Sequence, residues 1–115
     1  MISEKLFEQA TRAKAICNAF SLQMLKHFNV NIMIDEIDED QFNRLRQYNI
    51  PSAIGHADTA RVLNLECNRV NVKLNDFDCI IVVQLMGGRL PEGATTLPEG
   101  FSFKYLIVRT YPSDI

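Results

Sequence analysis

The chain has 115 residues, of which 47% are hydrophobic and 23% are charged, and its 12 basic and 14 acidic side chains give a net charge of −2. This size and composition predict one soluble globular domain that buries a core without disulfide or metal support. The charge balance argues against binding of long DNA or RNA over a broad face, because such binding usually needs a basic surface.

Nothing in the sequence predicts a membrane-bound or secreted protein. The longest apolar run, Cys79 to Val83, is far too short to cross a bilayer. The first 15 residues are charged and lack the apolar region of a signal peptide. The three cysteines (Cys17, Cys67 and Cys79) are an odd number without a CxxC spacing. We therefore expect free, buried thiols in a reducing cytoplasm and no zinc site.

The chain is expected to begin with helix and strand in alternation. Residues 1–14 have apolar side chains at helical spacing and predict a helical extension, which either docks on the core or projects from it. The main domain is then expected to occupy residues 15–115. A short buried strand is predicted at its start, over residues 13–18. Ser21 is a suitable N-cap for a helix over residues 22–28.

The middle of the chain predicts one strand and two more helices. Residues 29–35 alternate between apolar and polar side chains, as in a strand covered on the face that carries Ile34. Acidic residues at the start of residues 38–47 and basic residues near their end predict a helix there. A further helix over about 57–65 follows a loop opened by Pro51.

The rest of the chain predicts most of a sheet. Residues 70–74 and 78–85 have strand patterns, and the Asn75-Asp76 turn between them predicts a β-hairpin. A loop rich in Gly and Pro over 86–100 precedes a last alternating strand over 101–111. The predicted fold class is α/β (α+β), a single domain with a mixed sheet of about five strands, including the hairpin, flanked by helices.

Ile54-Gly55-His56, directly before the helix over 57–65, is the first candidate site. Gly55 has no Cβ, so it can adopt backbone angles closed to other residues and let a bound group come close. The N–H groups at a helix start favour a phosphate, and an adjacent imidazole can exchange a proton with it. A structural or surface histidine is the alternative for His56.

Gly87-Gly88-Arg89-Leu90-Pro91-Glu92-Gly93 is the second candidate. The functional interpretation is that Arg89 grips a phosphate bidentately while Glu92 orients it or binds a base or ribose. The alternative is a loose connection whose Arg–Glu pair is a surface ion pair of little energetic consequence. Arg69 is likewise either a second phosphate ligand or an ordinary charge at the entry to a strand.

The acidic run over residues 35–40 invites a two-metal nuclease hypothesis, but the helix start within it explains the run better. The run also lacks histidine partners. The sequence contains no P-loop, no GxGxxG and no Ser or Cys nucleophile motif. We therefore predict neither a metal nor a cofactor.

Four short motifs in order resemble those of the viral ring nucleases, which are small type III anti-CRISPR proteins. The motifs are Asn18-Ala19-Phe20-Ser21 with Met24-Leu25, Ile54-Gly55-His56 with Thr59, Asn68-Arg69-Val70 with Val72-Lys73-Leu74, and Arg89-Leu90-x-Glu92-Gly93. The resemblance extends from about Ala15 to Tyr111, and four motifs in register are more specific than any one of them.

The resemblance implies a two-fold homodimer that binds cyclic tetra-adenylate, the second messenger of type III CRISPR defence, across the subunit interface. Such proteins cleave the ring without metal and leave linear products with a 2′,3′-cyclic phosphate, which shuts off the signal. The catalytic residues implied are His56, Arg89 and Glu92. The ligand-binding residues implied are Asn18, Ser21, Gly55, Thr59, Arg69 and Arg89.

Two other functions stay open at this stage. One is a binding module of the same fold that sequesters a cyclic nucleotide without cutting it. The other is a protein-interaction factor of a mobile element with no nucleotide ligand. The sequence does not decide between viral evasion and host signal control, and it predicts neither long nucleic acid nor a membrane as a partner.

Overall fold

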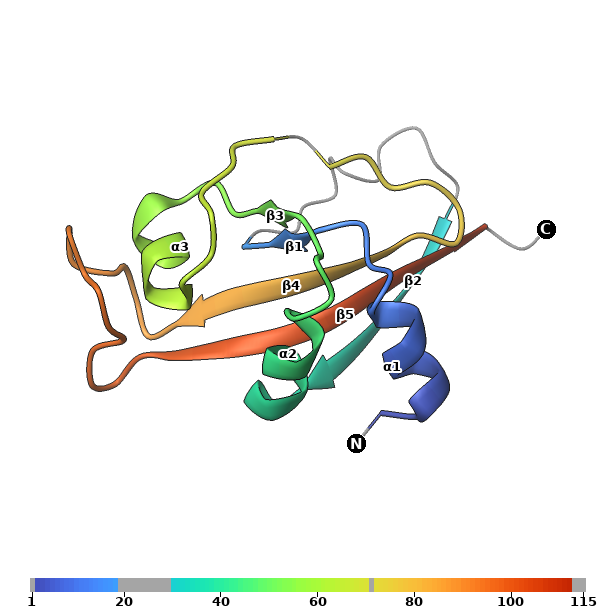
Figure 1. The fold of residues 1–115 in the computed structure, drawn as a ribbon, viewed down its shortest axis with the longest axis horizontal. Coiled ribbons are helices and arrows are strands. Elements are labelled where there is room, and N and C mark those ends of the chain that lie inside the picture. The colour runs from blue at the N-terminus through green and yellow to red at the C-terminus, as the bar shows by residue number, and fades with distance from the viewer. Residues whose placement is uncertain (1, 19–29, 71, 113–115) are drawn as a thin grey trace.

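A mixed sheet of five strands, in the order β2-β5-β4-β1-β3, forms the centre of the computed structural model (Figure 1). The structure describes residues 2–18, 30–70 and 72–112, and the elements below are those of the described part. The strands are β1 (Ile16–Cys17), β2 (Val30–Ile37), β3 (Ser52–Ala53), β4 (Cys79–Met86) and β5 (Ser102–Pro112). β5 pairs antiparallel with β2 and β4, whereas β1 runs parallel to β4 and β3.

The three described helices each have seven residues: α1 (Glu4–Ala10), α2 (Glu39–Leu45) and α3 (Ala57–Leu63). α2 starts with a capping box in which Asp38 and Gln41 each bond the other's backbone N–H. α3 ends at Asn64, whose left-handed backbone (φ 57°) stops the helix. The predicted helices over 38–47 and 57–65 are therefore confirmed, with earlier ends.

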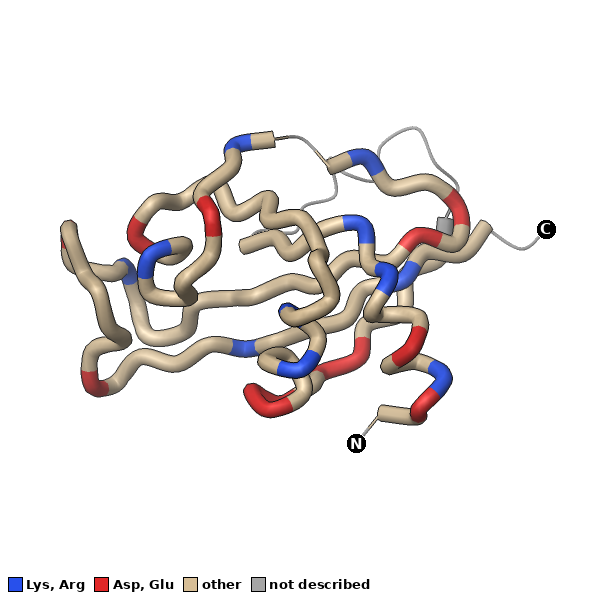
Figure 2. The backbone as a smooth tube through the Cα atoms, in the orientation of Figure 1, with Lys and Arg blue, Asp and Glu red and all other residues tan. Residues whose placement is uncertain are grey.

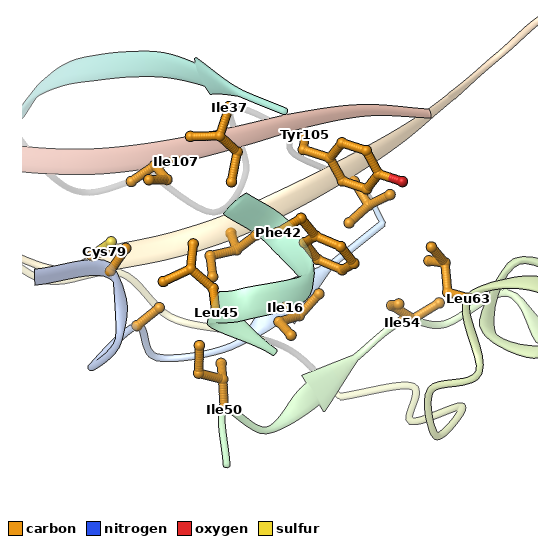
Figure 3. Packing of buried hydrophobic residues seen from close by; sticks show 14 of the residues in the cluster. Ile16, Ile37, Phe42, Leu45, Ile50, Ile54, Leu63, Cys79, Tyr105 and Ile107 are labelled. Atoms are coloured by element: carbon orange, nitrogen blue, oxygen red, sulfur yellow. The ribbon is translucent and has the colours of Figure 1, made fainter. Parts of the chain in front are cut away.

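All three helices contribute side chains to one core on the same face of the sheet (Figure 3). Phe42 of α2 stacks on Tyr105 of β5 with ring centroids 4.6 Å apart. Leu6 and Ala10 of α1 are buried in the same core, and the Arg44 guanidinium lies 4.6 Å from the ring centroid of Phe7. The N-terminal segment thus docks on the domain.

The predicted β-hairpin is wrong. Residues 72–78 form no strand, and β4 pairs instead with β5 and β1. Leu74 is 1% exposed and packs in the second hydrophobic cluster, on the other face of the sheet. An extended segment that crosses a sheet face with one buried anchor has the same short alternation as a strand. The fifth strand is β3, which the sequence had suggested was a loop.

The other predicted strands are found with shifted boundaries. Residues 29–35 correspond to β2, but Ile34 is 54% exposed, because β2 lies at the edge of the sheet. The last predicted strand is β5. The helix expected over 22–28 lies outside the described residues. Over the described ranges, no helix has both the length and the apolar character to cross a membrane.

Candidate functional site

Three neighbouring strands, β3, β1 and β4, run parallel, so their carboxyl ends all lie at the same end of the sheet (Figure 1). Asn18 follows β1, Ile54-Gly55-His56 follows β3, and Gly87 follows β4. Ligand sites in open α/β sheets form outside the carboxyl ends of the strands, because loops from adjacent strands meet there. The fold thus brings two of the four motifs, and the start of the loop that carries the fourth, to one end of the sheet.

Gly55 is held by side chains on both sides. Its N–H donates to Asn18 Oδ1 at 3.1 Å, and its carbonyl accepts from Arg69 Nε at 2.8 Å. Arg69 is exposed, and its terminal guanidinium nitrogens have no hydrogen-bond partner among the described residues. One arginine can therefore fix the backbone before His56 and still offer N–H donors to an anion.

Further hydrogen bonds hold residues 66–68, which follow α3, beside β3. Asn68 donates its backbone N–H to the Ile54 carbonyl at 2.9 Å and its side-chain Nδ2 to the Ser52 carbonyl at 3.0 Å. Ser52 Oγ in turn donates to the carbonyl of Glu66 at 2.6 Å. Cys67 lies in this segment and is exposed, so the expectation of a buried thiol is wrong at this position.

Gly55 does not have the special backbone conformation that was expected of it. It is not among the glycines with positive φ. A Cβ added there would approach Arg69 Cγ to 3.5 Å, which is ordinary van der Waals contact. The fold would accept alanine at this position, so the backbone conformation does not require glycine here.

His56 occupies the N-cap position of α3, with extended backbone angles. Its side chain makes no capping hydrogen bond and is exposed. α3 itself is a poor anion site, because it is short and carries the acidic Asp58 in its first turn. Any phosphate bound here must be held by side chains, and not by the helix start that the sequence suggested.

The loop after β4 returns to the start of α3. Asp58 Oδ1 accepts from Arg61 Nη1 at 2.8 Å and from the Gly93 N–H at 3.3 Å. Arg61 Nη1 also donates to the Ala94 carbonyl at 3.3 Å. The hydrogen bond from Arg61 lowers the pKa of the Asp58 carboxyl, and partial burial opposes it. The carboxylate is therefore ionised at neutral pH.

The remaining predicted residues divide into exposed and inaccessible ones. Arg89 and Glu92 are exposed in the loop and form no ion pair with each other, and the alternative of a loose connection stays open. Thr59 is 5% exposed within α3 and offers a ligand almost no surface. Ser21 lies outside the described residues.

The comparisons with known proteins identify the family. The model of the STIV B116-like family matches residues 14–102. The chain belongs to the STIV B116-like family. B116 of Sulfolobus turreted icosahedral virus is a similar solved structure, with a TM-score of 0.65, 31% identity, and coverage of 82% of this chain and 96% of that chain. No curated protein matches the chain.

The range that matches the STIV B116-like family contains every candidate site residue, from Asn18 to Glu92, whereas α1 lies before it. Asp58 and Arg61 were not singled out in the sequence. An acid in a first helical turn and a base three residues later, directly after the candidate histidine, is the local signal that was available. Their contacts with the loop have no sequence signature.

Charges of both signs are spread along the described chain of this STIV B116-like protein (Figure 2). Structural contacts account for three acidic residues of the run, and Glu39 and Asp40 lie in the first turn of α2. Asp38 caps α2, Asp35 pairs with Arg109 at 3.0 Å, and Glu36 lies 3.6 Å from Lys104. In the described ranges, no three His, Cys, Asp or Glu side chains are grouped to hold one metal ion.

Proposed function

We propose that the protein is a ring nuclease that cleaves cyclic tetra-adenylate and so shuts off type III CRISPR signalling. The observation that carries the proposal is the exposed His56 imidazole, which follows a backbone held by Asn18 and Arg69 beside the loop that carries Arg89. Membership of a family that includes a virus protein supports it. The four motifs of the ring-nuclease resemblance all fall inside the matched range.

The reaction places three demands on the protein. The substrate's own 2′-hydroxyl attacks the neighbouring phosphorus, so the protein must hold it in line with the leaving 5′-oxygen. Charge that develops on the phosphoryl oxygens needs fixed donors, which Arg69 and Arg89 provide. The leaving oxygen needs a proton, which is the role of His56 as a general acid. Glu92 orients the ligand from the same loop.

A second copy of the chain is part of the proposal. Cyclic tetra-adenylate has four like nucleotides, so opposite phosphates are related by two-fold symmetry. Two subunits around a two-fold axis would present the same groups to both of those phosphates. Oligomeric state measured with and without the ligand tests this part independently of cleavage.

The direct test incubates the purified protein with labelled cyclic tetra-adenylate in EDTA, beside the His56→Ala variant. The wild type should release linear products that end in a 2′,3′-cyclic phosphate. The His56→Ala variant should cleave about 10²–10⁴-fold more slowly, because it lacks the general acid. Its affinity for the intact ring should change little. Added imidazole should restore part of the rate if the lost function is proton transfer.

Gln47→Ala is the control, because this exposed residue follows α2 and lies in none of the motifs. It should cleave at the wild-type rate. If the wild type binds cyclic tetra-adenylate tightly but does not cleave it, the protein is a binding module that sequesters this ligand. Neither binding nor cleavage would favour a protein-interaction factor. Cleavage that needs added magnesium would contradict the metal-independent mechanism.

A further inference from the structure

The loop between β4 and β5 begins beyond the end of β1. β1 last pairs with β4 at Val82, and β4 then continues to Met86. Four more residues at about 3.3 Å each carry the strand roughly 13 Å past the end of β1. The loop must turn toward α3 if Arg89 and Glu92 are to serve the same phosphate as His56.

The loop does pass beside α3 (Figure 1), and it forms a tight turn where Gly93 bonds to Asp58. The Ala94 N–H donates to the Pro91 carbonyl at 3.1 Å, so Glu92 and Gly93 are the central residues of a β-turn. Gly93 has a φ of +80°, which is the conformation that the third residue of a type II turn requires. Glu92 is thus presented from a defined position of this turn.

We propose that Asp58 and Arg61 are positioning residues, which hold this turn against α3 and so set Arg89 and Glu92 relative to His56. The two side chains bond to the backbone on either side of the Gly93–Ala94 peptide. Asp58 accepts from the Gly93 N–H, and Arg61 donates to the Ala94 carbonyl. The inference has a structural half, that the two side chains hold the turn, which rests on geometry alone. Its catalytic half, that this sets Arg89 and Glu92 for the reaction, rests on the proposed function.

The exposure of the ion pair argues that stabilising α3 is not its main purpose. The Arg61 side chain is 44% exposed and the Asp58 side chain is 19% exposed. A pair between two such side chains contributes little by itself, because water screens it. The geometry of the pair matters more than its energy, because Asp58 and Arg61 orient each other toward the backbone of the loop. Both bond to backbone atoms, so the contact positions the loop whatever side chains the loop carries.

The structural half is tested without ligand, by amide hydrogen exchange over residues 87–94. Asp58→Ala should speed exchange about threefold to tenfold, since it removes the acceptor for Gly93 and the partner that orients Arg61. Asp58→Asn keeps an acceptor oxygen and should speed exchange less. Asp40→Asn is the matched control, because Asp40 is also a first-turn acid of a seven-residue helix. It should leave exchange in this loop unchanged.

The catalytic half is tested on cyclic tetra-adenylate with the same variants, at a temperature where all are folded. Asp58→Ala should lower the single-turnover rate constant about tenfold or more, with a smaller change in dissociation constant, because misplaced groups cost rate. Asp58→Asn should retain more of the rate. A residue that only stabilised the fold would shift the melting temperature and leave this rate constant unchanged.

Each outcome decides part of the proposal. Unchanged exchange over the loop in Asp58→Ala would overturn the structural half. Faster exchange with an unchanged rate constant would overturn the positioning role and leave the proposed function standing. A wild-type protein that does not cleave the ring would overturn the proposed function and the positioning role together. The exchange experiment would then still decide whether the two side chains hold the loop.

Discussion

Gly87, directly after β4, is where an added methyl group should destabilise the fold most among the loop glycines. Its φ of +111° is rare for L side chains, and a Cβ would lie 2.7 Å from the Gly100 carbonyl oxygen and 3.0 Å from Phe101 Cα. Backbone strain of this kind costs about 1–3 kcal/mol. Overpacking against backbone atoms that cannot rotate away costs about another 1–3 kcal/mol. Gly87→Ala should therefore lower the free energy of unfolding by about 2–6 kcal/mol.

Gly88→Ala is the matched control, because it keeps the strain and removes the collision. Its φ is +132°, but an added Cβ would meet only the Phe101 ring, at 3.8 Å or more. Urea denaturation of the wild type and both variants gives the free energies of unfolding. Gly87→Ala should be less stable than Gly88→Ala by about 1–3 kcal/mol. Equal stabilities would refute the reasoning that the two ends of the loop need this close approach.

Two further predictions concern the candidate site and the thiols. Gly55→Ala should change the free energy of unfolding by no more than about 0.5 kcal/mol, since its Cβ meets no obstacle. Weaker binding of cyclic tetra-adenylate by this folded variant would show that the glycine gives the ligand access. A destabilised fold would contradict the geometry. Near neutral pH a thiol reagent should modify the exposed Cys67 quickly, whereas burial raises the pKa of Cys17 and Cys79 to about 11 and keeps them protonated. Rapid modification of more than one thiol in the native protein would rule this out, and all three should react in denaturant.

The sequence predicted the long elements well, because their burial follows a regular period. β5 extends over 11 residues and alternates in burial as far as Ile107, and the helix after Asp38 carries its own capping signal. β1 falls within the strand predicted over residues 13–18. β3 has only two residues and exists because β1 pairs with it, which no local pattern records. The false hairpin arose from five residues of alternation around Leu74, which is too short a stretch to separate a strand from a covering segment.

Within the candidate site, residues from three of the motifs contact one another. Asn18 and Arg69 both bond to the backbone of Gly55, although they are 51 residues apart in the chain (69 − 18). The details depended on tertiary structure. The ordinary φ of Gly55 and the exposure of Cys67 follow from how residues 66–69 pack beside β3. The catalytic and ligand-binding roles of these residues remain predictions that the kinetic experiments decide.

The central place of β5 in the sheet determines when the protein can finish folding during its synthesis. β5 is made last of the five strands, yet it lies between β2 and β4 and pairs with both. A ribosome adds 75 residues between the end of β2 at Ile37 and the end of β5 at Pro112 (112 − 37). At about 5–20 residues per second this takes roughly 4–15 s. Throughout that interval β2 lacks its only partner strand in the described part of the chain, so its backbone N–H and C=O groups stay open to pairing with other chains.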